Sequence, residues 1–235
     1  TGRVGYIIPK QWGFDNYINL WTKTSFPIWF RNTLITALAT AVLQTLMVLS
    51  VSYVLSRLRF KGRKLLMNTC LVLGMFPGFV TMIVLYKVLS GMGLTGANSV
   101  PGLILVYCAS SGMGYYVSKG FFDTIPKSLD EAARVDGASR FQVFYKVIMP
   151  LSKPIVIYTV LTAFMAPWAD FMFAKYISHN TEVGLQYWIS SKTLIATNYT
   201  MFCAGGVVVA LPVTILFMLL QRYYVEGVTG GAVKG

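Results

Sequence analysis

Charge is scarce in this sequence, and acidic charge is the scarcest. Only 12% of the 235 residues are charged, whereas soluble globular domains average roughly 25%. Eight acidic residues stand against twenty Lys and Arg, which gives a net charge of +12, and the mean hydropathy is +0.61. This composition excludes an ordinary soluble domain and indicates a membrane protein. The basic excess is then typical of the cytoplasmic face of a membrane protein, not of a nucleic-acid partner.

Residues that could bind metals, form disulfides or bind nucleotides are also few. The three cysteines, Cys70, Cys108 and Cys203, lie in apolar runs without metal-ligand spacing, so we expect small buried hydrophobes. The single histidine, His179, lies alone in a polar stretch and is not expected to bind metal. No G-x-x-x-x-G-K-[ST] phosphate loop occurs. We therefore expect no metal or cofactor in this chain, and no enzymatic activity.

Long apolar runs are what the sequence has in abundance. A hydrocarbon core about 30 Å thick needs roughly 20 apolar residues per helix. Small, polar and helix-bending residues interrupt the runs, which favours a packed bundle over isolated spans. The sequence predicts an all-α polytopic transmembrane helix bundle. Its five expected spans are Leu34–Leu55, Leu65–Val88, Val100–Phe122, Ile155–Ile177 and Met201–Tyr224.

Lys and Arg in the short loops predict the orientation, because the richer side stays cytoplasmic. The loops after the first and third spans are rich in them, which makes residues 123–150 and the tail 225–235 cytoplasmic. Residues 1–28 and the loop 178–200 are then extracytoplasmic, around a transmembrane domain at 29–224. Five spans place the first residue outside the membrane and the last residue inside. We expect that a sixth, N-terminal span is missing from the chain.

The loop 123–150 is the most charged passage of the chain, and helix signals divide it into two short helices. Ser128 with Glu131, and Ser139 with Gln142, have the spacing of capping boxes, so a helix is expected to begin at each serine. A glycine, Gly137, is expected to end the first helix. Pro150 is expected to reset the chain before the fourth span.

The helix pair has two plausible partners. We expect it to expose Ala132 and Ala133, which allow a partner to approach closely, and an aromatic face of Phe141, Phe144 and Tyr145. This favours a protein interface. The alternative is a helix pair held on anionic lipid headgroups by basic side chains, and the pattern alone does not decide between them. The basic side chains are Lys127, Arg134, Arg140 and Lys146.

The same stretch carries a family resemblance. "EAARVDGASRFQVFYKVIMP" resembles the Glu-Ala-Ala, three residues, Gly, nine residues, Ile-x-Leu-Pro signature of the membrane subunits of bacterial ABC importers. Glu131, Ala132, Ala133, Gly137 and Pro150 match it. Val147 replaces the isoleucine and Met149 the leucine, with apolar bulk kept. "WFRNTLITALAT", "SRLRFKGRK" and "LLQRYYVEGVTGGAVKG" extend the likeness to the MalG-type permeases of carbohydrate importers, over nearly the whole chain.

The resemblance implies a function and partners. It implies the permease subunit of an ATP-driven importer of sugars, oligosaccharides above all, in the bacterial inner membrane. The implied partners are a second permease, two cytoplasmic ATPase subunits that bind ATP and Mg, and an extracytoplasmic sugar-binding protein. Residues matching the signature would couple ATPase closure to the transport pathway, Glu131 by contacting a basic group of the ATPase and Gly137 by forming the turn.

Substrate or receptor contacts are less clearly marked. Asp170 and Trp168, in "PWADFMFA", stand where the family often has a Trp-Asn-Glu-Phe-like element; Asp170 is either a pathway group or a structural cap. Thr181 to Lys192 would contact the receptor or form a passive lid. Aromatic side chains that stack on sugar or simply pack are Tyr86, Tyr107, Tyr115 and Tyr116.

Other functions remain open at this point. An ABC importer for a non-sugar solute has the same signature. An ion-coupled secondary carrier needs ionisable groups at mid-membrane, and the spans offer almost none besides Asp170. A membrane scaffold would transport nothing.

Overall fold

A computed structural model describes residues 13–75, 78–170, 172–178 and 198–232. Throughout these ranges the regular structure is helical, which confirms the predicted all-α class. The elements are α1 (Asp15–Thr22), α2 (Phe26–Arg57), α3 (Arg63–Gly74), α4 (Gly78–Gly91), the 3-10 turn η1 (Gly96–Asn98), α5 (Ser99–Ala109), α6 (Gly112–Thr124), α7 (Ser128–Val135), α8 (Arg140–Gln142), the π-helical η2 (Val143–Ile148), α9 (Met149–Leu151), α10 (Lys153–Ala169), α11 (Met172–Ser178) and α14 (Tyr199–Ala232).

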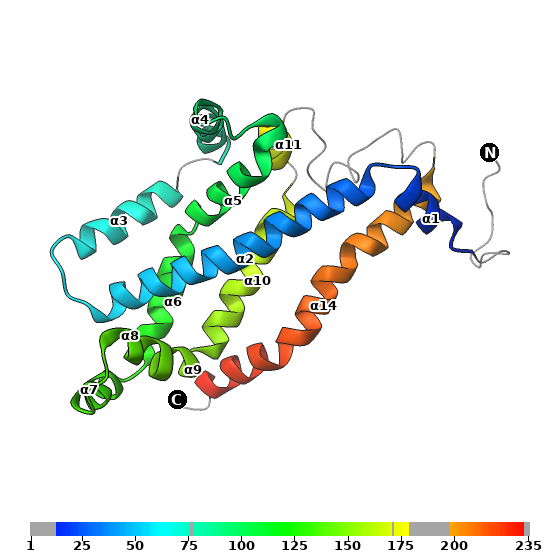
Figure 1. The fold of residues 1–235 in the computed structure, drawn as a ribbon. Coiled ribbons are helices and arrows are strands. Elements are labelled where there is room, and N and C mark those ends of the chain that lie inside the picture. Colours follow the sequence, from blue (N-terminus) through cyan, green and yellow to red (C-terminus); the bar gives the residue numbers. More distant parts are fainter. Residues whose placement is uncertain (1–12, 76–77, 171, 179–197, 233–235) are drawn as a thin grey trace.

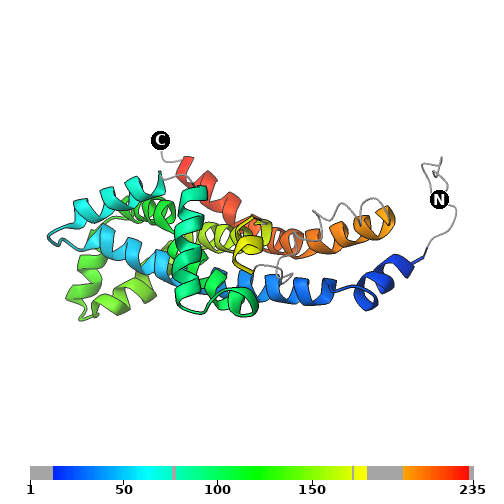
Figure 2. The same ribbon diagram turned by 90° about the horizontal axis from the view of Figure 1, so that it is seen from above.

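The longest helices lie side by side in an elongated bundle (Figures 1 and 2). Helix α2 packs against α10, α6 and α5, and α14 packs against α10 and α1. The apolar faces of α1, α2, α10 and α14 form one core, because a helix in a bundle is stabilised mainly by burying such a face. The core residues of this cluster are Leu20, Phe26, Trp29, Ala37, Ala41, Ala163, Phe164, Trp168, Met201 and Val209.

Small polar side chains line the buried face of α2. They allow close helix approach and hydrogen-bond within or between helices, as expected in a packed membrane bundle. The Gln44 amide donates to Ser111 Oγ at 3.0 Å, and Ser52 Oγ donates to the Tyr115 carbonyl at 3.1 Å. These two bonds join α2 to α6 and its N-cap. The opposite side of α2 is apolar and exposed, which suits lipid or another membrane helix.

Within the described ranges, α2 (Phe26–Arg57) and Tyr199–Gln221 are each long and apolar enough to cross a membrane. Two bent pairs bring the total to four if each pair forms one span. In one pair Val80–Gly91 meets Gly96–Ala109 at 103°, and in the other Arg140–Leu151 meets Lys153–Ala169 at 86°.

Breaks also fall inside three expected spans. The expected second span is divided between α3 and α4, the third between α5 and α6, and the fourth between α10 and α11. Gly74, Ser110 and Asp170 mark these breaks. Apolar composition alone does not reveal them, since broken helices in a bundle keep their hydrophobicity while neighbouring groups bond the freed backbone. Helix α14 continues to Ala232, although the glycine-rich end of the chain favours disorder.

A close approach at Gly102 holds the bend between α4 and α5. A methyl group on Gly102 would lie 2.5 Å from the Leu94 carbonyl oxygen and 3.2 Å from Leu94 Cβ. Leu94 belongs with Leu89, Leu103, Val106, Ala174 and Ile177 to a second apolar cluster that joins α4, α5 and α11. Only glycine allows the α5 backbone to pack this closely on the turn.

We predict that Gly102→Ala destabilises the protein by about 1–3 kcal/mol, because the added methyl group overpacks the turn. Thermal unfolding in mild detergent measures the change. Gly120→Ala is the matched control: Gly120 also lies inside a helix, but a methyl group there meets nothing within 4 Å. The control should unfold no earlier than the parent protein, since alanine favours a helix. Equal losses in both variants would contradict the role of Gly102.

Candidate functional site

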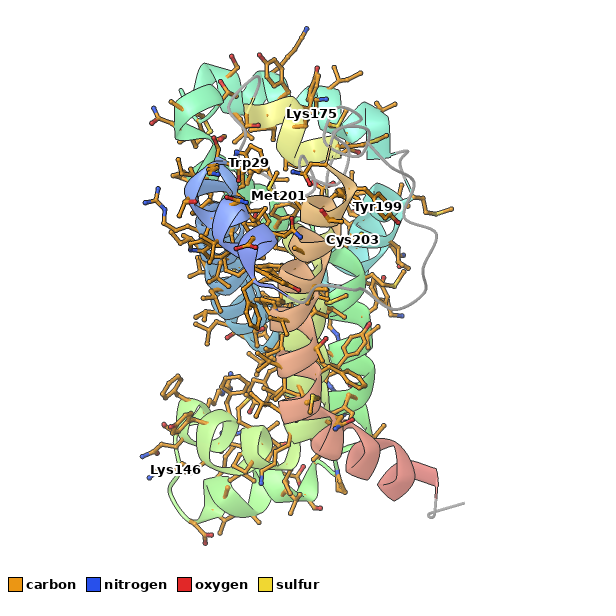
Figure 3. The ribbon with its side chains drawn as sticks, turned by 90° about the vertical axis from the view of Figure 1, so that its right-hand side faces the viewer. Trp29, Lys146, Lys175, Tyr199, Met201 and Cys203 are labelled. Carbon is orange, nitrogen blue, oxygen red and sulfur yellow. The ribbon has the colours of Figure 1, made fainter. Side chains whose placement is uncertain are left out.

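The loop 123–150 lies at one end of the bundle. Helices α7, α8 and α9 gather there with Lys146, while Lys175 on α11 and Tyr199 at the start of α14 lie at the opposite end (Figure 3). The end of α2 and the start of α10 meet the loop. Helix α2, which the loop meets at its end, is long and apolar enough to cross a membrane.

The first helix of the loop begins as expected, but the predicted capping box at Ser128 is wrong. Lys127 occupies the N-cap position of α7 and makes no side-chain cap bond. Ser128 is already helical, so its hydroxyl cannot take the geometry that an N-cap requires. The chain instead enters through a tight turn in which Leu129 N–H donates to the Pro126 carbonyl at 3.3 Å. Backbone carbonyls thus accept hydrogen bonds from N–H groups at the start of α7. The sequence pattern predicts that side chains accept them.

Gly137 ends α7 as predicted. It has φ +83°, a left-handed conformation that favours glycine, and its N–H donates to the Arg134 carbonyl at 3.1 Å. Ala138 N–H donates to the Ala133 carbonyl at 3.0 Å, which completes a Schellman motif. Ala133 and Ala138 both pack on the cluster beneath. The turn between the two helices is therefore fixed by backbone bonds and by burial.

The second helix begins with the predicted capping box and then changes its pitch. Ser139 Oγ accepts from Gln142 N–H at 3.3 Å, and the Gln142 side chain accepts from Ser139 N–H at 2.7 Å. Residues Val143–Ile148 form a π-helix ahead of Pro150. A π-turn widens the helix where a proline would otherwise clash with the carbonyl four residues earlier. The helix continues past Pro150 to Leu151, and the 86° bend falls at Ser152.

An apolar cluster attaches the helix pair to the bundle. Its buried members are Leu49, Phe122, Ile125, Val143, Ile148 and Ile155, from α2, α6, the loop and α10. The Phe144 ring packs on Tyr53 with centroids 4.7 Å apart, and Met149 also packs against the cluster. Phe144 and Ala133 thus face the protein itself, which corrects the expectation that both belong to an exposed surface. Val147 is half-buried and Pro150 is exposed.

A buried ion pair joins α7 to the end of α2. Arg57 Nε lies 2.8 Å from Asp130 Oδ2, with side chains 6% and 16% exposed, and Arg57 Nη2 donates to the Ile125 carbonyl at 2.9 Å. Burial raises the pKa of Asp130 above its ordinary value, while the Arg57 guanidinium acts in the opposite direction. Sequence reasoning missed both residues. The sequence signals for this contact were an acidic residue next to Glu131 and an arginine near the end of a predicted span.

Two aromatic side chains face away from the cluster. Phe141 and Tyr145 are 74% and 66% exposed and stack with their rings 5° from parallel and centroids 6.5 Å apart. Val135 is exposed too, and Ala132 lies on the exposed side of α7. Exposed apolar groups set among charges are typical of a protein contact surface. The helix pair thus has an inner face that anchors it and an outer face that is available to a partner.

Glu131 is exposed and lines a pocket of about 380 Å³ between the end of α2 and the helix pair. The pocket's charged walls are mainly basic groups of this chain. They comprise Arg57, Arg59, Lys127, Arg134 and Arg140 against Asp130 and Glu131. In the part of the chain that the structure describes, no group of three His, Cys, Asp or Glu side chains could hold a metal ion.

The structure gives Asp170 and Trp168 structural contacts at the opposite end of α10. Asp170 caps α11 by accepting from Phe173 N–H at 3.3 Å and Ala174 N–H at 3.1 Å, and it accepts from the Tyr107 hydroxyl at 2.6 Å. Trp168 is 3% exposed, stacks on Phe164 and donates to the Val209 carbonyl at 3.3 Å. Thr181 and Lys192 lie outside the described residues.

The other tyrosines also make contacts within the chain. The Tyr116 hydroxyl donates to the Met67 carbonyl at 2.6 Å, and Tyr86 packs on Tyr176 with centroids 4.8 Å apart. These contacts favour packing over sugar stacking.

Comparison with known proteins assigns the family. The model of the binding-protein-dependent transport system inner membrane component matches residues 45–230. The chain belongs to this permease family. The match includes the whole loop 123–150 and confirms the predicted resemblance to membrane subunits of ABC importers. It also agrees with the expectation that this chain is a transport subunit without enzymatic activity.

Permeases of two sugar transport systems are among the relatives. The maltodextrin permease protein MdxG of Bacillus subtilis (strain 168) is 35% identical over 96% of this chain and 82% of its own length. The galactooligosaccharides permease protein GanQ of the same organism is 34% identical over 97% and 83%. In a bacterial ABC transporter involved in alginate import, one chain has the same fold, with a TM-score of 0.79, 23% identity and coverage of 95% and 84%.

We predict that Asp130→Asn loosens the helix pair by about 3 kcal/mol, because it leaves a buried guanidinium without its counter-charge. Amide hydrogen exchange over residues 126–150 measures the opening of the pair. Lys119→Gln is the control, since it breaks the Lys119–Asp123 pair within α6, whose carboxylate is 41% exposed. Such exposed pairs contribute at most about 1 kcal/mol. Exchange that rises equally in both variants would show that Asp130 has no special anchoring role.

Proposed function

We propose that this permease imports oligosaccharides, with ATP hydrolysed by a separate subunit docked on the loop 123–150. The observation that carries the coupling proposal is the two-faced helix pair. Its inner face is fixed to α2, α6 and α10, while Ala132, Phe141 and Tyr145 are exposed. Because the inner face is fixed to the bundle, a partner bound to the exposed face would move the helix pair and the bundle together.

The substrate class rests on the relatives. MdxG and GanQ are named for sugars built from different units, yet both substrates are oligosaccharides. We infer that the shared property, a chain of sugar units, extends to this permease. Its partners are then a second permease, which completes the pathway, two ATPase subunits that bind ATP and Mg, and an extracytoplasmic binding protein. The exposed apolar side chains of α2 and α14 suit contact with lipid and with the second permease.

The basic loops support a cytoplasmic position for the helix pair and for the C-terminus. Closure of the ATPases pulls on α7 through Ala132 and on α8 through Phe141 and Tyr145. The pull reaches α2 through the Arg57–Asp130 ion pair and α10 through the bend at Ser152. Packed helices move as rigid bodies, so the displacement appears as a change in helix position at the pathway. Glu131, Val147, Met149 and Pro150 complete the coupling region.

We predict that Glu131→Lys weakens coupling, because it reverses the charge offered to a basic group of the ATPase. Proteoliposomes containing both permeases, the ATPase and the binding protein serve to measure ATP-driven uptake of labelled maltodextrin and galactooligosaccharide. Uptake should fall about tenfold or more, which corresponds to about 1.4 kcal/mol of lost interaction.

Asp136→Lys provides the matched control, since Asp136 is an exposed acid at the end of the same helix and does not line the pocket. It should transport within about twofold of the parent, as expected for an exposed charge outside the contact. Normal uptake by the Glu131 variant would refute its coupling role. Uptake that needs an ion gradient and no ATP would instead identify a secondary carrier.

We predict that Phe141→Ala with Tyr145→Ala weakens ATPase binding to the permeases. Removing exposed aromatic anchors from an interface typically costs about 2 kcal/mol or more of binding energy. Co-purification in mild detergent measures the loss of ATPase, and thermal unfolding of the permease should change little. Phe144→Ala is the contrasting variant, which lowers the unfolding temperature because Phe144 packs on Tyr53. Full ATPase recovery with the double variant would exclude this face as the docking surface.

A further inference from the structure

The basic pocket beside the helix pair has features of a binding site that the coupling function does not require. Its volume of about 380 Å³ lies within the range of small-molecule sites. Five basic side chains and two carboxylates line it, which leaves a formal charge of +3. Like charges gathered around a hollow with protein walls repel one another and concentrate anions from the surroundings.

A fixed positive charge beside the pocket supports this view. Arg57 is 6% exposed; its Nε lies 2.8 Å from Asp130 Oδ2 and its Nη2 donates to the Ile125 carbonyl at 2.9 Å. These contacts hold the guanidinium in place in the lining of the pocket, where it adds to the positive potential. The planar guanidinium suits phosphate oxygens in particular.

The position of the pocket indicates where a phosphate group would come from. We infer a position near the lipid headgroups, because Arg57 is the last residue of α2, a helix long and apolar enough to cross a membrane. Leu58 and Val143 add apolar surface to its wall. We propose that this pocket binds a phosphate ester, supplied by the headgroup of an anionic phospholipid or by a soluble phosphate ester.

The proposed phosphate lies between Arg57 on one side and Lys127, Arg134 and Arg140 on the other. It bridges the end of α2 to both helices of the pair. The stacked rings of Phe141 and Tyr145 do not line the pocket, whereas Glu131, which we propose to contact the ATPase, does. The sequence alone groups Lys146 with the other basic residues of the loop, but the structure leaves Lys146 out of the pocket wall.

Binding tests the proposal directly, on the full chain in neutral detergent. The probes are short-chain phosphatidylglycerol, short-chain phosphatidylcholine and glycerol 3-phosphate, measured by native mass spectrometry and calorimetry. We expect phosphatidylglycerol to bind and phosphatidylcholine to bind at least fivefold more weakly, as expected when a net-neutral headgroup replaces an anion. Equal binding of glycerol 3-phosphate identifies a soluble ester as a sufficient ligand, and its failure identifies the lipid as the source.

Matched variants distinguish the pocket from general attraction to a basic protein. Arg140→Gln removes a pocket cation and should weaken phosphatidylglycerol binding about fivefold, as one basic residue near an anionic surface contributes. Lys146→Gln removes the same charge from the same segment outside the pocket and should change binding less than twofold. Glu131→Gln removes a pocket anion and should tighten binding.

Equal effects of Arg140→Gln and Lys146→Gln, or no binding of either phosphate probe, would overturn the proposal. Each of these readouts is made without ATPase, binding protein or sugar. Failure of the phosphate site therefore leaves the transport function untouched, and failure of transport leaves the phosphate site untouched.

Discussion

One buried charge pair fixes the position of the helix pair on the bundle. Arg57 and Asp130 are both removed from water, and such a pair loses solvation that only close geometry and further hydrogen bonds offset. The Ile125 carbonyl supplies one such bond. An apolar pair of similar size could hold the helices as firmly. A charge pair also fixes their relative position, since displacement of either partner leaves the other charge buried and uncompensated.

Position matters in the proposed coupling, because the loop would connect movement of the ATPase to movement of the bundle. The cluster around Phe122, Val143 and Ile148 resists separation of the pair from the bundle, but apolar contact is weakly directional. Directional contacts come from the ion pair, from the backbone bonds around Gly137 and from the capping box at Ser139. In the proposed coupling, these contacts would let a pull on the outer face reach α2 and α10 with little internal bending. The π-helix before Pro150 is the segment where the regular bonding pattern is relaxed.

Local signals in the sequence were enough to predict the two short helices and the turn between them. Gly137 and the Ser139–Gln142 box depend on residues within four positions of one another, and both have their predicted roles. The box at Ser128 fails although its spacing is right, because the turn from Pro126 places Ser128 inside the helix. A spacing pattern cannot show which residue is the first with helical geometry.

Features that depend on distant residues could not be predicted in the same way. Arg57 and Asp130 are 73 positions apart, and nothing in the sequence between them indicates their contact. The inward turn of Phe144 depends on Tyr53 in α2, and the role of Asp170 depends on Tyr107 in α5. Breaks within the apolar runs are equally hidden, since a bent pair such as α4 and α5 is as hydrophobic as a straight span.

The contacts of Asp170 change the interpretation of an acidic residue within a predicted membrane span. An isolated carboxylate in a membrane span suggests an ion or proton pathway, because its burial is costly without a partner. Asp170 instead accepts three hydrogen bonds, two of them from the first turn of α11, where the helix dipole also favours a negative charge. The carboxylate thus compensates for the break between α10 and α11. An ion-driven carrier would therefore lack its best candidate group, which favours the proposed entry of energy at the rigid, exposed loop 123–150.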